Sequence, residues 1–326
     1  MIWTDGLDAG SADLVRDLNA RTLAFDGVAP LSGHVLDSLS LDSLVLDSLG
    51  LNSLGQNSAG ATSEKYLLVS ADGEVVAAAV SHGSDPVELF VAPESRRRGL
   101  GADLLAAALE RGNGVWAHGN LPPASALAER LGLAATRTLL QMRRTLEPDW
   151  VAEQLALSGM PDGVRLRTFV PGQDEEQFLG VNARAFEWHP EQGRLDLAGL
   201  RAEMMQTWFD PEGFFLAVDD ADTVLGFHWT KVHTTEASPR QAGQEDLGEV
   251  YVLGADPLAA VDGLPVRGLG GALTTAGLAH LAGRGLRTVL LYVEGDNVNA
   301  LRLYRRLGFE IFATDIVYDL RPERST

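Results

Sequence analysis

Residues 248–253 read GEVYVL, and residues 267–271 read RGLGG. The first run is almost wholly apolar and predicts a buried strand that carries one carboxylate, Glu249. The second run predicts a glycine-rich turn that opens a helix over residues 272–281. Glycine permits the backbone conformations of a tight turn, and a helix N-terminus offers unpaired N–H groups to a phosphate. The strand, the turn and the helix together predict a site for a phosphate-bearing ligand.

An earlier stretch repeats this pattern, with VELFV at residues 87–91 and RRRGLG at residues 96–101. The elements expected around the two stretches follow the same order: a hairpin, the carboxylate-bearing strand, the glycine turn with its helix, then strand, helix and strand. An Asp-Gly pair at Asp72 and Gly73 marks the first hairpin. This order predicts an internal duplication of about 150 residues and an α/β fold with a mixed sheet in each copy.

The domain boundaries are predicted at residues 1–147 and 163–326, with residues 147–163 expected to form a linker punctuated by Pro148 and Pro161. Residues 36–58 carry a five-residue repeat, LDSLSLDSLVLDSLGLNSLGQNS. A period of five fits neither a helix nor a strand, and the run is too short for a solenoid. We expect a tolerated, mobile surface-loop expansion, because added loop length costs little free energy. Binding to a partner or a membrane is the alternative.

The overall composition excludes several functions. The net charge of -19 argues against general nucleic-acid binding, and the absence of cysteine removes disulfides, thiolate zinc sites and a cysteine nucleophile. His228 and His233 lie five residues apart, on opposite faces of a strand, so we expect no metal and treat all seven histidines as structural or surface residues. Residues 1–20 carry acidic residues and no basic segment that leads into an apolar one, so we expect that they are not a signal peptide. No apolar run approaches the roughly 20 residues of a membrane span. We expect a cytoplasmic monomer that does not bind membranes.

The glycine turns and the last helix resemble a known superfamily. By itself the pattern R-x-x-G-x-G at residues 96–101 is also found in plain turns, but it resembles the pyrophosphate-binding turn of the GCN5-related N-acetyltransferases, which hold acetyl-CoA there. Residues 296–309, DNVNALRLYRRLGF, match the pattern N-x-x-A-x-x-x-Y-x-x-x-G-F, which places a helix beside CoA in that superfamily.

Four further segments are similar to the mycothiol synthase family, a tandem group within that superfamily: WAHG at 116–119, HPEQG at 189–193, GFHWTKVH at 226–233 and GEVYVLG at 248–254. The resemblance implies two tandem acetyltransferase domains. It also implies transfer of acetyl from acetyl-CoA to the cysteinyl amine of a cysteinyl-glucosaminyl-inositol conjugate, the last step of mycothiol biosynthesis. Catalysis is then expected in the C-terminal half, while the N-terminal half binds acetyl-CoA without turnover.

Glu249 is the candidate general base, because a carboxylate within an apolar strand is desolvated and its pKa moves toward the working range. The alternative is an edge-strand glutamate that faces solvent. Tyr304 is the candidate acid for the departing thiolate, and a half-buried packing tyrosine is the alternative. The backbone N–H near Leu253 is expected to polarise the acetyl carbonyl from a splayed or bulged strand.

The resemblance also implies contacts to both substrates. Glu191, Lys231, Glu249 and Tyr292 are expected to hold the amine substrate; solvent exposure is the alternative for Lys231, and core packing for Tyr292. The acetyl-CoA contacts implied are, in the first half, Leu89, Phe90, Val91, Arg97, Arg98, Gly99, Leu100, Gly101 and Ala102, and, in the second half, Leu253, Gly254, Ala255, Arg267, Gly268, Leu269, Gly270, Gly271, Asn297, Val298, Asn299, Ala300, Leu301 and Arg302.

The chain departs from the family pattern at three places. Gly33 stands where the family has a substrate-binding glutamate, so Asp37 or His34 replaces it or the contact is missing. Residues 258–266 lengthen the second turn and place Pro265, which has no N–H, before Arg267. We expect the turn to form from Arg267 onward while the extra residues loop out. Ala128 occupies the first-half position that corresponds to Tyr304, as expected for a non-catalytic copy.

Two other functions remain open from the sequence. One is N-acetylation of a different amine, such as an aminoglycoside or a protein N-terminus. The other is a non-catalytic acetyl-CoA-binding regulator, which only Gly33 and the altered turn at Pro265 favour.

Overall fold

The computed structural model describes residues 2–40, 64–157, 159–187, 192–234 and 245–320. The chain forms two compact units. Unit 1 comprises Met1–Leu140, Glu294–Asp296 and Ala313–Thr326, and unit 2 comprises Gln141–Val293 and Asn297–Phe312. Strands β6 and β14 each run from one unit into the other, so the units do not follow a single division of the sequence.

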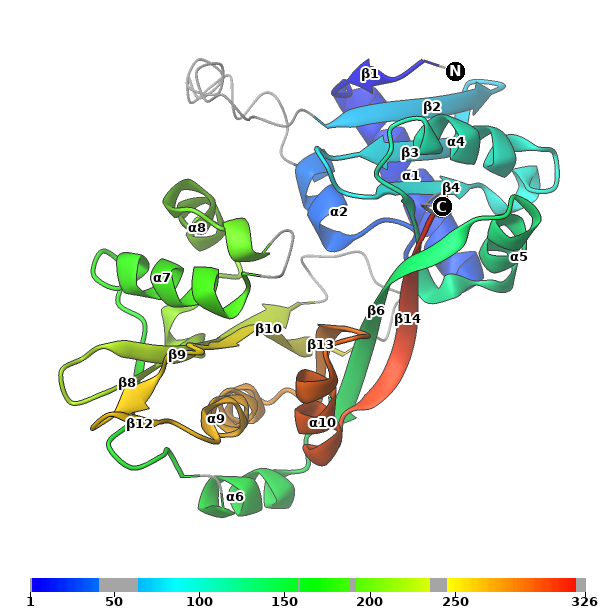
Figure 1. Ribbon diagram of the computed structural model, residues 1–326. Coiled ribbons are helices and arrows are strands. Elements are labelled where there is room, and N and C mark those ends of the chain that lie inside the picture. Colours follow the sequence, from blue (N-terminus) through cyan, green and yellow to red (C-terminus); the bar gives the residue numbers. More distant parts are fainter. Residues whose placement is uncertain (1, 41–63, 158, 188–191, 235–244, 321–326) are drawn as a thin grey trace, which may run out of the picture. The chain divides into compact units, whose positions relative to one another are not determined.

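Unit 1 is a mixed sheet with helices on both faces (Figure 1). Its strands lie in the order β1-β2-β3-β4-β5-β14-β6. Helices α1 and α2 pack on one face around Val15, Leu18 and Phe90, and α4 and α5 pack on the other around Leu104 and Ala128. The elements are β1 (Thr4–Asp5), α1 (Ala9–Asp26), α2 (Gly33–Ser40), β2 (Lys65–Ala71), β3 (Glu74–Ser81), β4 (Val87–Val91), η2 (Pro93–Ser95), α4 (Leu100–Leu109), β5 (Val115–Ala117), η3 (His118–Asn120), α5 (Pro122–Arg130), β6 (Ala134–Thr145) and β14 (Glu310–Asp319).

The last strand of the chain completes unit 1. Strand β14 pairs antiparallel with β5, with Ile316 opposite Ala117 and Tyr318 opposite Val115. The Thr136 hydroxyl of β6 donates to the Val317 carbonyl of β14 (3.3 Å). The first hairpin forms as predicted, because Asp72 and Gly73 adopt the positive φ angles, 52° and 87°, of a tight turn between β2 and β3.

Unit 2 repeats the architecture, with the strand order β13-β10-β9-β8-β7. Helices α7 and α8 cover one face and α9 covers the other (Figure 1). The elements are α6 (Pro148–Leu157), β7 (Arg165–Thr168), α7 (Glu175–Ala185), η4 (Gln192–Arg194), α8 (Leu197–Met204), η5 (Pro211–Gly213), β8 (Phe214–Val218), β9 (Val224–His233), β10 (Leu247–Ala255), β11 (Ala260–Val261), β12 (Leu264–Pro265), α9 (Leu269–Gly283), β13 (Thr288–Glu294) and α10 (Val298–Arg306).

The core beneath α7 is aromatic. The Phe214 ring lies between Phe169 and Trp229, with ring centroids 4.4 and 4.6 Å away, and the Phe178 ring meets Phe214 edge-on at 5.0 Å. All four side chains are almost fully buried. Burying such a side chain stabilises a fold by roughly 1.5–3 kcal/mol, so this cluster fixes α7 firmly on the β8–β9 hairpin.

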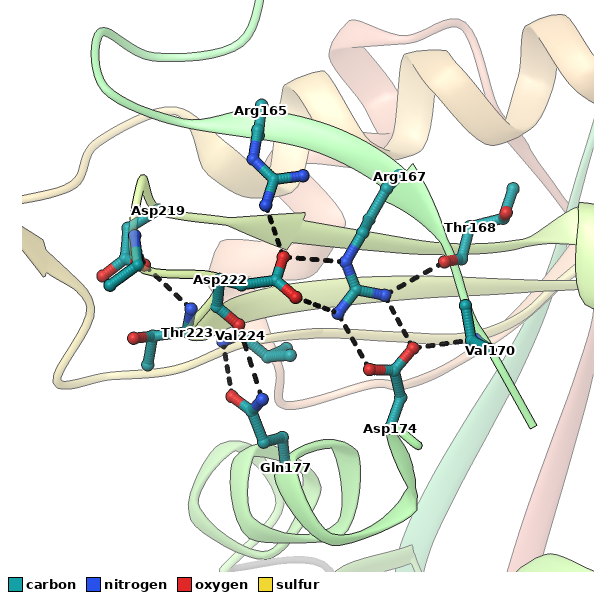
Figure 2. A network of polar contacts seen from close by, with 11 residues as sticks. Arg165, Arg167, Thr168, Val170, Asp174, Gln177, Asp219, Asp222, Thr223 and Val224 are labelled. Atoms are coloured by element: carbon teal, nitrogen blue, oxygen red, sulfur yellow. Dashed lines mark hydrogen bonds and ion pairs between the residues drawn. The ribbon is translucent and has the colours of Figure 1, made fainter. Parts of the chain in front are cut away.

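A polar network secures the outer strand of unit 2 (Figure 2). The guanidinium of Arg167, on β7, donates two hydrogen bonds to Asp174 (2.6 and 2.8 Å) and two to Asp222 (3.0 and 3.1 Å). Asp174 precedes α7 and is fully buried, and Asp222 lies in the β8–β9 turn. Arg165 makes a further ion pair with Asp222. One arginine therefore joins the edge strand, the helix and the hairpin turn.

Two predictions about the connecting segments are wrong. Most of the expected linker at 147–163 is helix α6, because Pro148 is its first residue, the helical position that tolerates proline best. Residues 36–40 of the repeat are not irregular, because they form the end of α2, where Val35 and Leu39 are buried. The repeat from residue 41 onward lies outside the described residues.

Candidate active site

Glu249 lies on the central part of the unit 2 sheet. Strand β10 pairs with β9 on one side and β13 on the other, and the Glu249 residue is only 6% exposed. The alternative of an edge-strand glutamate facing solvent is therefore wrong. The β9 ladder shifts register between Val250 and Val252, which is the bulge expected in this strand. Tyr251, at this bulge, packs against the rings of Trp208 and Trp229.

The carboxylate of Glu249 has a histidine partner. The Nε2 atom of His233, on β9, lies 2.5 Å from Oε2 of Glu249, within hydrogen-bond distance. The Glu249 side chain is 8% exposed and that of His233 is 27% exposed. This contact joins a buried carboxylate to a side chain that reaches solvent.

Lys231 stands directly opposite Glu249 in the β9–β10 ladder. Its Nζ atom lies over the aromatic rings of Trp208 and Tyr251, 4.2 and 5.0 Å from their centroids. The Tyr251 hydroxyl donates to the Glu203 carboxylate of α8 (3.1 Å). The aromatic faces stabilise the ammonium group by cation–π attraction and set where it is presented.

Strands β10 and β13 diverge at the site. Their parallel ladder runs from Leu247 and Thr288 to Val250 and Leu291, whereas β10 continues to Ala255. The stretch from Tyr251 to Ala255 thus has one side without a β13 ladder. Leu253 lies on this stretch, and its side chain packs with the α9 core.

The glycine turn of unit 2 forms from Arg267 onward, as predicted. Gly268 has a φ of 79° and precedes α9, whose first hydrogen bonds run from the Gly271 and Ala272 N–H groups to the Gly268 carbonyl. The N–H groups of Leu269 and Gly270 therefore have no partner among the described residues, and the Arg267 side chain is exposed. The inserted residues form a small hairpin, β11 and β12, in which Pro265 pairs with Ala260.

Helix α10 carries Tyr304 and begins at a capped end. The Asn297 side chain accepts the Ala300 N–H (3.1 Å), and Arg302 is exposed. Tyr304 is 7% exposed, and burial raises the pKa of its phenol above the ordinary value. The hydroxyl is protonated at neutral pH, as a proton donor requires, and the raised pKa makes it a weaker acid than a phenol in water. Tyr292 of β13 is 46% exposed, which excludes the core-packing alternative, and its hydroxyl accepts from the Gln141 amide (2.6 Å).

Unit 1 contains the corresponding glycine turn. Gly99, with a φ of 94°, precedes α4, and the Arg97 and Arg98 side chains are exposed. Arg96 points elsewhere, because its guanidinium makes a bidentate ion pair with Asp26 (2.8 and 2.6 Å). Leu100, Gly101 and Ala102 lie in the first turn of α4, while Leu89, Phe90 and Val91 belong to β4.

Unit 1 also has a buried carboxylate at the place of Glu249, but this one is enclosed. Glu88 accepts the Ser32 N–H (2.6 Å) and lies 3.6 Å from Nε2 of His118. The other ring nitrogen of His118 lies 3.3 Å from Asp315 of β14, which accepts the Gly119 N–H (2.6 Å). Burial opposes protonation of His118, but the two carboxylates outweigh it and raise its pKa to about 10. Ala128, at the place of Tyr304, is buried and offers no hydroxyl.

Two predicted substrate contacts are not placed. Glu191 lies outside the described residues, and Asp37 belongs to α2, with only its backbone described. Within the described ranges, no group of three or more His, Asp or Glu side chains is arranged as metal ligands. Nor does any helix in this part of the chain have the length and apolar character needed to span a bilayer.

The comparisons with known proteins agree with this geometry. The profile of the Acetyltransferase (GNAT) family matches residues 43–133 and 181–309. The fold is that of a GNAT acetyltransferase: a tandem GNAT protein from the clavulanic acid biosynthesis pathway matches it with a TM-score of 0.64 at 19% identity, over 97% of each chain. A GCN5-related N-acetyltransferase from Sphaerobacter thermophilus matches with a TM-score of 0.61 at 23% identity, over 98% of this chain and 96% of the other.

Proteins of similar sequence identify the family to which this chain belongs. The mycothiol acetyltransferase of Nocardia farcinica is 45% identical over 97% of this chain and 96% of its own length. That of Rhodococcus erythropolis is 43% identical over 98% and 99%, and that of Saccharomonospora viridis is 51% identical over 72% and 74%. The chain belongs to the mycothiol acetyltransferase family.

Sequence reasoning missed the partners of the two buried carboxylates. His233 and His118 had been assigned to structural or surface positions, yet they contact Glu249 and Glu88. The aromatic support of Lys231 was also missed. The available signal was the strand alternation that puts Trp229, Lys231 and His233 on one face of β9.

Proposed function

We propose that unit 2 transfers the acetyl group of acetyl-CoA to the cysteinyl amine of a cysteinyl-glucosaminyl-inositol conjugate, the reaction that completes mycothiol. The observation that carries this proposal is the buried Glu249 on a bulged strand that diverges from β13. Family membership supports the choice of acceptor. We assign catalysis to residues 163–326 and a non-catalytic acetyl-CoA site to residues 1–147.

The residues of unit 2 fit an acetyl-CoA donor. The free N–H groups of Leu269 and Gly270 at the start of α9, with the exposed Arg267, suit the pyrophosphate. Arg302 and the N-terminal turn of α10 would contact the same donor, and residues 253–255 would lie along its pantetheine arm. When bound, the donor supplies an acetyl group activated as a thioester.

Three groups of unit 2 would then serve the transfer. Glu249 accepts a proton from the acceptor's ammonium group, which frees the lone pair of the amine for attack. The Leu253 N–H donates to the acetyl carbonyl and stabilises the negative charge that develops on its oxygen. Tyr304, whose phenol is protonated at neutral pH, donates its proton to the departing thiolate.

Lys231 and Tyr292 would orient the acceptor. The Lys231 ammonium, held over Trp208 and Tyr251, can donate to sugar or inositol hydroxyls, and the exposed Tyr292 offers its hydroxyl from the neighbouring strand. Glu191 and Asp37 remain proposed acceptor contacts. In unit 1, the exposed Arg97 and Arg98 beside the Gly99 turn support the second acetyl-CoA site.

An acetyl-transfer assay on the conjugate tests the proposal. Glu249→Gln should lower kcat by about a hundredfold or more, as expected when a general base is lost. Glu212→Gln, an exposed glutamate of the same unit, is the control and should retain wild-type activity. Full activity of Glu249→Gln with an unchanged pH profile would refute the assignment of the base. A panel of other amines, followed by release of free CoA, tests the acceptor: preference for an aminoglycoside or a peptide N-terminus would replace the conjugate.

A further inference from the structure

The carboxylate of Glu249 is buried, so a proton that it accepts needs a route to solvent. Within the described residues, Nε2 of His233 lies 2.5 Å from Oε2 of this carboxylate, and the imidazole tautomer decides which of the two atoms carries the hydrogen between them. The His233 side chain is more than three times as exposed as that of Glu249, at 27% against 8%. The imidazole is therefore a bridge between the buried carboxylate and water.

The neighbouring titratable groups do not offer the same route. Lys231 faces Glu249 across the ladder, but its ammonium lies on the rings of Trp208 and Tyr251 and makes no ion pair with Glu249 in the described chain. The Tyr251 hydroxyl is engaged by Glu203 of α8. On β13, Leu290 is paired with Glu249, and the hydroxyl of Tyr292, two residues further along, is bonded to Gln141.

We propose that His233 is a positioning residue that holds Oε2 of Glu249 and carries the abstracted proton away. This inference rests on the proposed function, in which Glu249 is the base. The N–H bond of the acceptor ammonium breaks and an O–H bond forms on Glu249. That O–H bond then breaks as Nε2 of His233, in the tautomer that carries its hydrogen on Nδ1, takes the proton, and the imidazolium releases its Nδ1 proton to water. Proton exchange between the ring nitrogens and water then restores the Nδ1–H tautomer. Both side chains return to their starting states, and no other reactant is consumed.

Unit 1 supplies an internal contrast. There the imidazole of His118 lies between two carboxylates, Glu88 and Asp315, which hold its pKa near 10 and keep it protonated. A permanently protonated imidazole cannot accept a proton from Glu88. His233 has one carboxylate, that of Glu249, within ion-pair distance among the described residues. The glutamate position that β4 and β10 share thus faces an imidazole held between two carboxylates in unit 1, from η3, and an imidazole beside one carboxylate in unit 2, from β9.

The test compares substitutions of His233 in the full chain. His233→Gln keeps an N–H donor toward Glu249 but cannot carry a proton, and His233→Ala removes both functions. We expect kcat to fall about tenfold in His233→Gln while the acceptor KM changes by less than about twofold. The pH profile of kcat should change in His233→Gln, because the amide that replaces the imidazole does not take up a proton. Added imidazole should restore kcat in His233→Ala.

The control is His280→Gln, a half-buried histidine on α9 of the same unit, whose pH profile should match the wild type and should not respond to imidazole. Wild-type kcat and pH profile in both His233 variants would overturn the proposal. So would a fall in kcat that imidazole does not reverse and that leaves the pH profile intact, because His233 would then only support the fold. If Glu249→Gln loses activity while the His233 substitutions have no effect, this inference alone is refuted. If Glu249→Gln keeps full activity, the proposed function is refuted.

Discussion

Replacing Asp315 by asparagine should destabilise unit 1 in a pH-dependent way. Asp315 and Glu88 lie 3.3 and 3.6 Å from the His118 ring. At these distances each carboxylate attracts the imidazolium by roughly 5 kcal/mol at an effective dielectric constant of about 20, before the cost of burying the charges. Removing one partner from a buried pair costs about 3–5 kcal/mol. Because asparagine keeps an oxygen for the Gly119 N–H, we expect the lower value, about 3 kcal/mol.

The pH dependence follows from the raised pKa of His118. The pKa is higher in the folded chain, about 10, than its ordinary value of 6.5. A group of this kind stabilises the fold fully below its unfolded pKa, and the contribution is lost as pH rises through its folded pKa. Wild-type unit 1 should therefore lose stability between about pH 6.5 and 10. Asp315→Asn should weaken this dependence, because the imidazolium then has one carboxylate partner.

Hydrogen exchange measures the stability of unit 1 separately from that of unit 2. A local measurement is needed because a chain of two units need not unfold in one step. The opening free energy of peptides covering β14 and residues 117–120 should fall by about 3 kcal/mol in Asp315→Asn at pH 6. Asp319→Asn, at the end of the same strand, is the control and should change it by less than about 0.5 kcal/mol. Equal protection in the two variants, or wild-type protection that does not change from pH 6.5 to 10, would refute the reasoning.

Three further predictions concern unit 2. Arg167→Ala should destabilise the unit by about 3–5 kcal/mol, because it leaves the buried Asp174 without its arginine partner. Arg165→Ala, which removes an exposed ion pair, should cost under about 1 kcal/mol. Urea denaturation compares the two variants, and equal losses of stability would contradict the network in Figure 2. Tyr304→Phe should lower kcat by roughly tenfold to a hundredfold with little change in stability, and unchanged kcat would exclude it as the proton donor. Gly268→Ala should weaken acetyl-CoA binding, because the φ of 79° at Gly268 is strained for alanine. Calorimetry measures the affinity, and a wild-type value would show that this turn does not hold the donor.

Local sequence patterns were sufficient to predict the strands and helices around Glu249. The apolar run ending at Leu253 is β10, and the glycine turn before α9 lies where predicted, because periodicity and glycine act over a few residues. Helix α6 was not predicted from the linker signals around Pro148, although proline suits the first residue of a helix.

Contacts between distant residues could not be predicted in the same way. The bond between His233 and Glu249 depends on the register of β9 against β10, and no local pattern fixes that register. The ion pair of His118 with Asp315 joins residues that are 197 positions apart in the chain, and it requires β14 to pair with β5. The sequence shows the two histidines, but it does not show which carboxylates they contact.

The pairing of β14 with β5 also restricts how this protein can be made and divided. Unit 1 includes residues from 313 onward and unit 2 includes residues up to 312, so this protein cannot complete unit 1 before the residues of unit 2 have been made. The usual order of folding during translation, in which the N-terminal domain matures first, is therefore not available to it. A fragment ending at residue 147 would leave β5 with an open edge, which invites aggregation.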